Sequence, residues 1–179
     1  MRICVFCSAN GGLDPDFYTM AAELGRVIGR GGHALVFGGT DMGLMQAVAE
    51  AAREAGGRVI GVVPERVEER GHTSRLMDVH IPCADLTDRK QLMMAQADAF
   101  VALPGGIGTL DELFTVAASA TIGYHSKPLV LFNMKGYWNS LIAMLDDLAA
   151  RGAVRGSWRD VVSVAGTLEE VMEKLKIKS

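Results

Sequence analysis

Three short apolar runs in this chain each lead into a glycine-containing loop. The runs and their loops are 3–7 with 8–12, 33–37 with 38–43, and 99–103 with 104–109. A helical pattern follows each loop, and short continuous apolar runs are typical of buried parallel strands. We therefore predict an α/β fold over residues 1–179: a single Rossmann-like domain with a doubly wound, mainly parallel sheet and helices on both faces. Ligands of such sheets bind beyond the carboxyl ends of the strands, where these loops should converge.

The third loop opens the segment 104–112, which reads P-G-G-I-G-T-L-D-E. The first N–H groups of a helix have no partner within it, and the helix dipole favours an anion there. Glycines remove the side chains that would keep a ligand away from that backbone. Thr109 and Glu112 also fit the capping box S/T-x-x-E, a structural alternative that leaves the glycines and the proline unexplained.

The glycine loops lack the patterns of the best-known nucleotide sites. A dinucleotide site needs G-x-G-x-x-G, which neither 38–43 nor 105–108 provides. Segment 38–43 has the frame of a P-loop, but Leu44 and Met45 follow where a lysine and a serine or threonine are required. Without that lysine, a triphosphate is disfavoured and a single phosphate is the better fit.

Arg89 and Lys90 fall near the start of a helix that we predict over 86–97, where the helix dipole repels cations. A local rule broken in this way indicates a site. The alternative is that Asp85 and Asp88 offset the charge and that both cations face water.

The composition bounds the kinds of partner. Apolar residues make up 49% and charged residues 22%, so we expect a globular domain with a good core. Because the net charge is −3 and no long basic run occurs, we expect no nucleic-acid partner. No apolar run approaches the ~20 residues of a membrane span. The N-terminus enters a strand without a signal-peptide layout, so we expect no membrane partner and a cytoplasmic location.

Cys4 and Cys7 match C-x-x-C, but residues three apart on a strand point to opposite faces of the sheet. We therefore predict buried thiols instead of a metal or redox pair. The four histidines show no metal-ligand spacing, so we expect no metal. The charged segment 65–75 lacks an apolar stripe, which indicates a solvated surface segment or, alternatively, a mobile flap near a site.

These motifs together resemble the LOG (LONELY GUY) family of cytokinin riboside 5′-monophosphate phosphoribohydrolases, which older descriptions often called lysine decarboxylases. The signature P-G-G-x-G-T-x-x-E is complete at 104–112, and the accompanying R-K is Arg89 and Lys90. Segments 38–45, 123–128 and 136–139 also look like family segments, so the resemblance covers nearly the whole chain.

The resemblance implies hydrolysis of the N-glycosidic bond of a nucleoside 5′-monophosphate to free base and ribose 5-phosphate, by a homodimer that needs no cofactor. It assigns catalysis to Arg89 and Glu112. The residues that we expect around the substrate and its phosphate are Ser8, Gly38, Gly39, Gly43, Leu86, Lys90, Pro104, Gly105, Gly106, Ile107, Gly108 and Thr109. An alternative on the same fold is a nucleotide- or molybdenum-cofactor-binding protein without catalysis, but the presence of both Arg89 and Glu112 favours the enzyme.

Two segments depart from the family pattern. Many members carry M-H-E-R-K, where this chain has L-T-D-R-K at 86–90. Many also carry a tryptophan in T-W-A-Q-L-G, where this chain has A-S-A-T-I-G at 118–123. The choice between adenine and N6-prenylated adenine therefore stays open, while Arg89 and Glu112 are both retained.

Overall fold

The computed structural model describes residues 1–177 of the chain. Within that range, seven strands form one sheet in the order β4-β3-β2-β1-β5-β6-β7, and all neighbours run parallel. The strands are β1 (Arg2–Phe6), β2 (Ala34–Phe37), β3 (Arg58–Pro64), β4 (Val79–Cys83), β5 (Ala99–Ala102), β6 (Leu129–Phe132) and β7 (Ser163–Ala165). The predicted doubly wound parallel sheet is confirmed.

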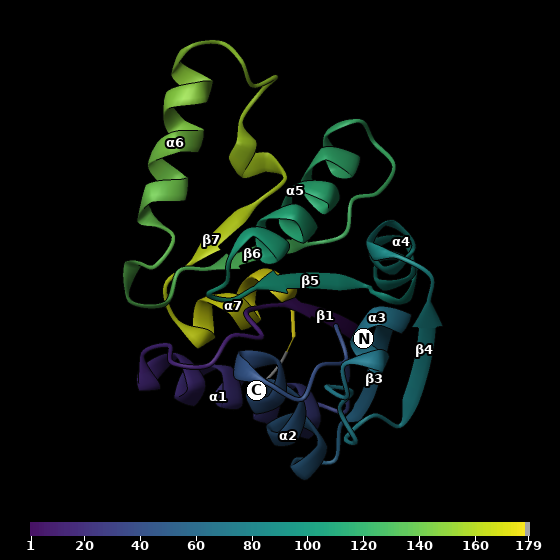
Figure 1. Cartoon of the computed structure of the whole chain (residues 1–179). Coiled ribbons are helices and arrows are strands. Elements are labelled where there is room, and N and C mark those ends of the chain that lie inside the picture. Colours follow the sequence, from purple (N-terminus) through teal and green to yellow (C-terminus); the bar gives the residue numbers. More distant parts are fainter. Residues whose placement is uncertain (178–179) are drawn as a thin grey trace.

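Helices cover both faces of this sheet, as predicted (Figure 1). The α-helices are α1 (Pro15–Arg30), α2 (Gly43–Glu54), α3 (Glu65–Glu69), α4 (Leu86–Gln96), α5 (Ile107–Thr121), α6 (Asn139–Ala150) and α7 (Leu168–Leu175), with the 3₁₀ turns η1 (Met134–Gly136) and η2 (Trp158–Asp160). One core contains buried residues of α1, α2 and α7, and a second contains buried residues of α4, α5 and α6. Each face of the sheet therefore has its own apolar layer.

The two cysteines of the C-x-x-C pattern fall in these separate layers. Cys7 belongs to the core that includes α1, and Cys4 to the core that includes α5. Both are buried free thiols, as predicted, because a strand directs residues three apart to opposite faces. Burial raises the pKa of each thiol well above its ordinary value.

The strand order reverses between β1 and β5, which lie side by side although β2, β3 and β4 separate them in the sequence. The loops after these strands touch, since the Ser8 amide donates to the carbonyl of Pro104 at 3.0 Å. The Leu44 amide in turn donates to the Ser8 carbonyl at 2.9 Å, which brings in the loop after β2. This is the topological switch point at which doubly wound sheets bind ligands.

Gly43 makes this convergence possible. Its φ is +59°, and a Cβ there would lie 2.6 to 2.8 Å from backbone atoms of Ala9, Ser8 and Asn10. Only glycine tolerates both the conformation and the close approach. The second glycine loop therefore serves first to pack against the first loop.

The charged segment 65–75 lies at the surface. It begins with the short helix α3, which the sequence analysis did not predict and in which no described residue is buried. Beyond α3 the chain is bonded to the loop after β2. The Asp41 amide donates to the His72 carbonyl at 3.1 Å, and the Ser74 amide donates to the Gly39 carbonyl at 2.8 Å. The surface interpretation is confirmed, and a flap motion stays a prediction.

Helix α4 is anchored to the sheet in an unusual way. Met93 alone is buried among its residues, all of which the structure describes, whereas α2 buries six.

None of the helices within residues 1–177 has the length and apolar character needed to cross a bilayer.

Candidate active site

A cavity of about 210 Å³ opens at the switch point, between the carboxyl ends of β1 and β5. Its walls come from the loop after β1, the start of α5, and single side chains of α2 and α4. The lining residues are Cys7, Ser8, Ala9, Asn10, Met45, Arg89, Gly106, Ile107, Gly108, Thr109 and Glu112. The loops after β1 and β5 converge in this cavity as expected, whereas no residue of the second glycine loop, 38–43, lines it.

Helix α5 begins at Ile107, three residues earlier than a capping box with Thr109 as its N-cap would place it. Its N-cap is Gly106, and no side chain of the described chain bonds to the first turn as a cap. The capping interpretation of Thr109 and Glu112 is therefore wrong. The Leu110 amide makes the first helical bond, to the Gly106 carbonyl at 3.0 Å. The amides of Ile107, Gly108 and Thr109 precede it and are free to bind an anion.

Glycine occurs at these loop positions for two different physical reasons. At Gly105, a Cβ would lie 2.0 Å from Oγ1 of the buried Thr109, so the fold itself requires glycine. At Gly106 and Gly108, a Cβ would meet no atom of residues 1–177 within 4 Å, and neither residue has a positive φ. Packing does not explain these two glycines, whereas a ligand that approaches the backbone does.

Arg89 is drawn inward from the first turn of α4. Asp85 caps this helix by accepting from the amides of Thr87 and Asp88. The Arg89 side chain is 12% exposed, so the interpretation in which this cation faces water is wrong. Its Nη2 donates to the Gly38 carbonyl at 3.0 Å, and its Nε donates to the Val62 carbonyl at 3.3 Å.

The Arg89 guanidinium lies in the space that a side chain at position 38 would fill. A Cβ on Gly38 would lie 1.7 Å from Arg89 Nη2, closer than any non-bonded contact allows. Gly38 lies outside the cavity lining and holds the arginine in place. Gly39, with φ +73° and a Cβ position 2.4 Å from Val63, is likewise required by the backbone turn.

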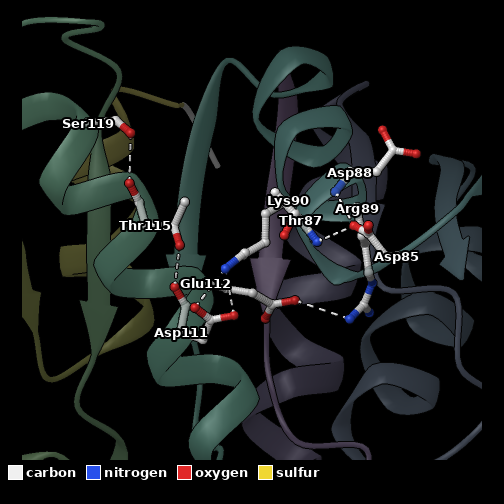
Figure 2. A network of polar contacts seen from close by, with 9 residues as sticks. All are labelled: Asp85, Thr87, Asp88, Arg89, Lys90, Asp111, Glu112, Thr115 and Ser119. Atoms are coloured by element: carbon white, nitrogen blue, oxygen red, sulfur yellow. Dashed lines mark hydrogen bonds and ion pairs between the residues drawn. The ribbon is translucent and has the colours of Figure 1, made fainter.

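Glu112 faces Arg89 across the cavity, with its Oε1 3.4 Å from Arg89 Nη1 (Figure 2). The Glu112 side chain is 6% exposed. Burial raises the pKa of Glu112 from its ordinary 4.5 to about 7, and the nearby Arg89 guanidinium opposes that rise. A carboxyl group that titrates near neutral pH in a cavity is a strong candidate for chemistry.

Lys90 turns away from the cavity. Its Nζ contacts both oxygens of Asp111, at 2.7 and 2.8 Å, and so links α4 to α5 (Figure 2). Lys90 and Leu86 do not line the cavity, and the Leu86 side chain is 61% exposed. The structure thus brings Ser8, Arg89, Glu112 and the first turn of α5 together. Gly38, Gly39, Gly43, Pro104 and Gly105 support that arrangement from behind.

Four lining residues were missed at the sequence level: Cys7, Ala9, Asn10 and Met45. Ala9 and Asn10 belong to the loop 8–12, which was predicted to reach this edge of the sheet, and Cys7 is the last residue of the strand predicted before that loop. Met45 lies two residues beyond Gly43, on the first turn of α2. For Cys7, Ala9 and Asn10, the position directly after β1 was the available signal, and Met45 had no such signal. Among residues 1–177, no group of three or more His, Cys, Asp or Glu side chains is placed to hold a metal ion.

Comparisons with known proteins place this geometry in a family. The family model described as "Possible lysine decarboxylase" matches residues 45–175. The chain is 40% identical to the probable cytokinin riboside 5′-monophosphate phosphoribohydrolase LOGL6 of Oryza sativa subsp. japonica, over 99% of this chain and 71% of that protein. It is 37% identical to the corresponding enzyme LOG3 of Arabidopsis thaliana, over 98% of this chain and 81% of that protein.

The chain belongs to the LOG family. The fold of this LOG-family chain also resembles the molybdenum cofactor carrier protein of Chlamydomonas, with a TM-score of 0.74 and 25% identity over 98% of this chain and 94% of that protein. The match to the family covers the signature 104–112, Arg89 and Lys90, on which the resemblance was first based.

Proposed function

We propose that this LOG-family protein hydrolyses the N-glycosidic bond of adenosine 5′-monophosphate or its N6-modified forms, releasing the free base and ribose 5-phosphate. The observation that carries the proposal is the buried pair Arg89–Glu112, 3.4 Å apart, beside the unbonded amides of α5. Its relatives in rice and Arabidopsis are named as enzymes of this reaction on cytokinin riboside 5′-monophosphates.

The first turn of α5 supports binding of one phosphate. The amides of Ile107, Gly108 and Thr109 and the helix dipole favour an anion, and Gly106 and Gly108 leave room for it. The loop carries no P-loop lysine, so the further phosphates of ATP gain nothing there. The binding energy of the remote phosphate is then available to orient the glycosidic bond.

Glu112 is placed to act on the ribose. It lies on the second turn of α5, about one helical turn beyond the phosphate-binding amides. Cleavage of a glycosidic bond passes through an oxocarbenium-like transition state, which a nearby carboxylate stabilises. The bond from C1′ to the base nitrogen breaks, the oxygen of a water bonds to C1′, and a proton from that water balances the departing base. Arg89 holds the Glu112 carboxylate and presents a positive charge to the substrate.

The base preference is a separate matter. Where many relatives carry tryptophan, this chain has Ser119, whose hydroxyl donates to the Thr115 carbonyl at 2.8 Å; that of Thr121 donates to Ala117 at 2.9 Å. Both hydroxyls are bonded within α5 and offer no donor that selects one base. We expect AMP and N6-isopentenyl-AMP both to be cleaved.

A second candidate function is binding of a nucleotide or molybdenum cofactor without cleavage. The fold similarity to a molybdenum cofactor carrier favours it. The Arg89–Glu112 pair favours the enzyme, because a carrier has no need for a buried carboxyl group with a pKa near 7.

Release of adenine separates these functions. We expect kcat/KM for AMP to exceed the values for adenosine and for ATP. Equal rates on adenosine and AMP would rule out phosphate anchoring at α5. Binding of AMP without release of adenine would favour the carrier function.

We also propose a homodimer that works in the cytoplasm and binds no nucleic acid. Large apolar side chains are exposed on α5 and just beyond it: Phe114 is 38% exposed, Ile122 68% and Tyr124 80%. These residues extend the predicted interface near Ser119. The buried thiols Cys4 and Cys7 suit a reducing compartment. Light scattering at micromolar concentration tests the dimer, and a monomeric mass would contradict it.

A further inference from the structure

Tyr137 reaches the signature loop from a distant part of the chain. Its hydroxyl donates to the carbonyl of Gly105 at 2.8 Å, although 32 residues separate them. Tyr137 itself does not line the cavity, whereas Gly106 does. The hydroxyl therefore meets the loop on the side that faces away from the cavity.

The geometry of the peptide bond gives this contact a consequence. In a planar trans peptide, the carbonyl and the following N–H point in opposite directions. Because the Gly105 carbonyl points to Tyr137, the N–H of Gly106 in the same peptide unit points the other way, toward the cavity. No backbone or side-chain acceptor within the described chain bonds to that N–H.

Resting on the function proposed above, we propose that Tyr137 is a positioning residue for phosphate binding: by fixing the Gly105–Gly106 peptide, it directs the Gly106 N–H at the phosphate. Gly106 has no side chain to hold its own orientation, and a Cβ there would meet nothing within 4 Å in residues 1–177. An outside constraint on this peptide is therefore needed, and Tyr137 supplies it.

The turn that carries Tyr137 is itself held firmly. Asn133 Oδ1 accepts from the Trp138 amide at 2.7 Å. Lys135 has the left-handed backbone conformation, with φ 50°, and its Nζ contacts Asp14 and Asp16 at 2.8 and 2.6 Å. A non-glycine residue in that conformation persists where the surroundings hold it. These contacts fix the turn to the start of α1.

The aromatic ring of Tyr137 is also packed. It lies edge-on to Phe17, with ring centroids 5.5 Å apart, and edge-on to Trp138 at 4.8 Å. Replacement of Tyr137 by phenylalanine keeps this packing and removes the hydroxyl alone. The variant Tyr137→Phe is therefore a specific test of the hydrogen bond to Gly105.

The first measurement is kcat/KM of Tyr137→Phe on AMP and on adenosine. We expect the value for AMP to fall about three- to tenfold, as for the loss of one hydrogen bond, and the value for adenosine to stay constant. The matched control is Tyr18→Phe, which removes a tyrosine hydroxyl from α1. Tyr18 does not line the cavity, so this substitution should change neither value. An equal fall on both substrates would mean that Tyr137 only packs, and would overturn the proposal.

The second measurement does not depend on turnover. Binding of ribose 5-phosphate, followed by titration calorimetry, should be weaker in Tyr137→Phe than in the wild type by a similar factor. Weaker binding in a protein that releases no adenine would refute the hydrolase while supporting the role of Tyr137. Unchanged affinity, or no binding by the wild type, would overturn that role.

Discussion

Lys90 on α4 and Asp111 on α5 form an ion pair, 2.7 Å apart, beside the Arg89–Glu112 pair: Lys90 follows Arg89 on α4, and Asp111 precedes Glu112 on α5 (Figure 2). In the outer pair the Lys90 side chain is 20% exposed and the Asp111 side chain 48%, whereas both side chains of the inner pair are buried. The two outer charges act on Glu112 in opposite senses: Asp111 raises the pKa of Glu112 and Lys90 lowers it, both after the larger effects of burial and Arg89.

The first prediction uses this opposition. If Glu112 acts as a carboxylate, kcat/KM on AMP rises with pH, with a midpoint near the Glu112 pKa of about 7. Lys90→Met removes a positive charge and should move the midpoint to higher pH. Asp111→Asn removes a negative charge and should move it to lower pH. The pH profiles of the two variants and the wild type provide the measurement.

A bridging role alone gives a different result. Each substitution breaks the same contact between α4 and α5, so a purely structural pair would change the profile in the same direction in both variants. Parallel shifts would therefore contradict the electrostatic role of Lys90 and Asp111.

The second prediction concerns the inner pair. Glu112→Gln and Arg89→Ala should each lower kcat for adenine release by about 10²–10⁴-fold, the usual loss for a positioned acid or base group. Circular dichroism should show that the fold is retained. The matched controls are Glu169→Gln on α7 and Arg30→Ala on α1, both exposed, which should keep wild-type turnover. Wild-type turnover in Glu112→Gln would leave Glu112 without a catalytic role.

The third prediction is a pH dependence of stability. The folded state holds the Glu112 pKa at about 7, above its ordinary 4.5. Between these values the folded protein keeps a proton that the unfolded chain has lost, so stability falls as pH rises from 4.5 to 7 and is level above. The contribution is roughly 3 kcal/mol, at about 1.4 kcal/mol per pKa unit.

Glu112→Gln lacks this titration. As pH rises from 4.5 to 7, the wild type should therefore lose stability relative to Glu112→Gln. The contributions of the other titrating groups are the same in both proteins and cancel in the difference of their unfolding free energies. Urea unfolding at several pH values measures it. A difference that is independent of pH would show that Glu112 titrates normally in the folded state.

The fourth prediction separates the two kinds of glycine. Gly108→Ala should raise the unfolding free energy by about 0.5–1 kcal/mol, because the site is helical and unobstructed, yet lower kcat/KM on AMP by filling the phosphate space. Gly38→Ala should instead lower activity by displacing Arg89. Gly11→Ala, where a Cβ meets nothing within 4 Å among the described residues, is the control for both. Unaltered AMP kinetics in Gly108→Ala would argue against a phosphate at α5.

Much of this fold follows from local pattern. Short apolar runs that end in glycine loops predict parallel strands, and the switch point follows from their alternation with helices. The burial of Cys4 and Cys7 on opposite faces required nothing beyond the geometry of a strand. The convergence of Arg89 and Glu112 came from the family resemblance and not from spacing.

The features that were missed depend on contacts between distant residues. Lys90 was expected at the substrate, but it meets Asp111, 21 residues away, because α4 and α5 lie side by side. The capping box at Thr109 was a valid local pattern, but Thr109 packs against Gly105 and the helix starts at Ile107. Helix α3 has no apolar stripe, so its sequence carries no periodic signal.

Because α4 buries only Met93, Arg89 has two roles: it faces Glu112 in the cavity, and it helps to hold α4 on the sheet. With one fully buried apolar residue in the helix, the bonds from Arg89 to Gly38 and Val62 add to the packing of Met93, Leu92 and Met94 in holding α4 on the sheet. Opening of this segment should cost less free energy than opening of α2, so its amides should exchange with deuterium sooner. A bound nucleotide that engages Arg89 would then slow exchange along all of α4, a helix whose other residues do not line the cavity.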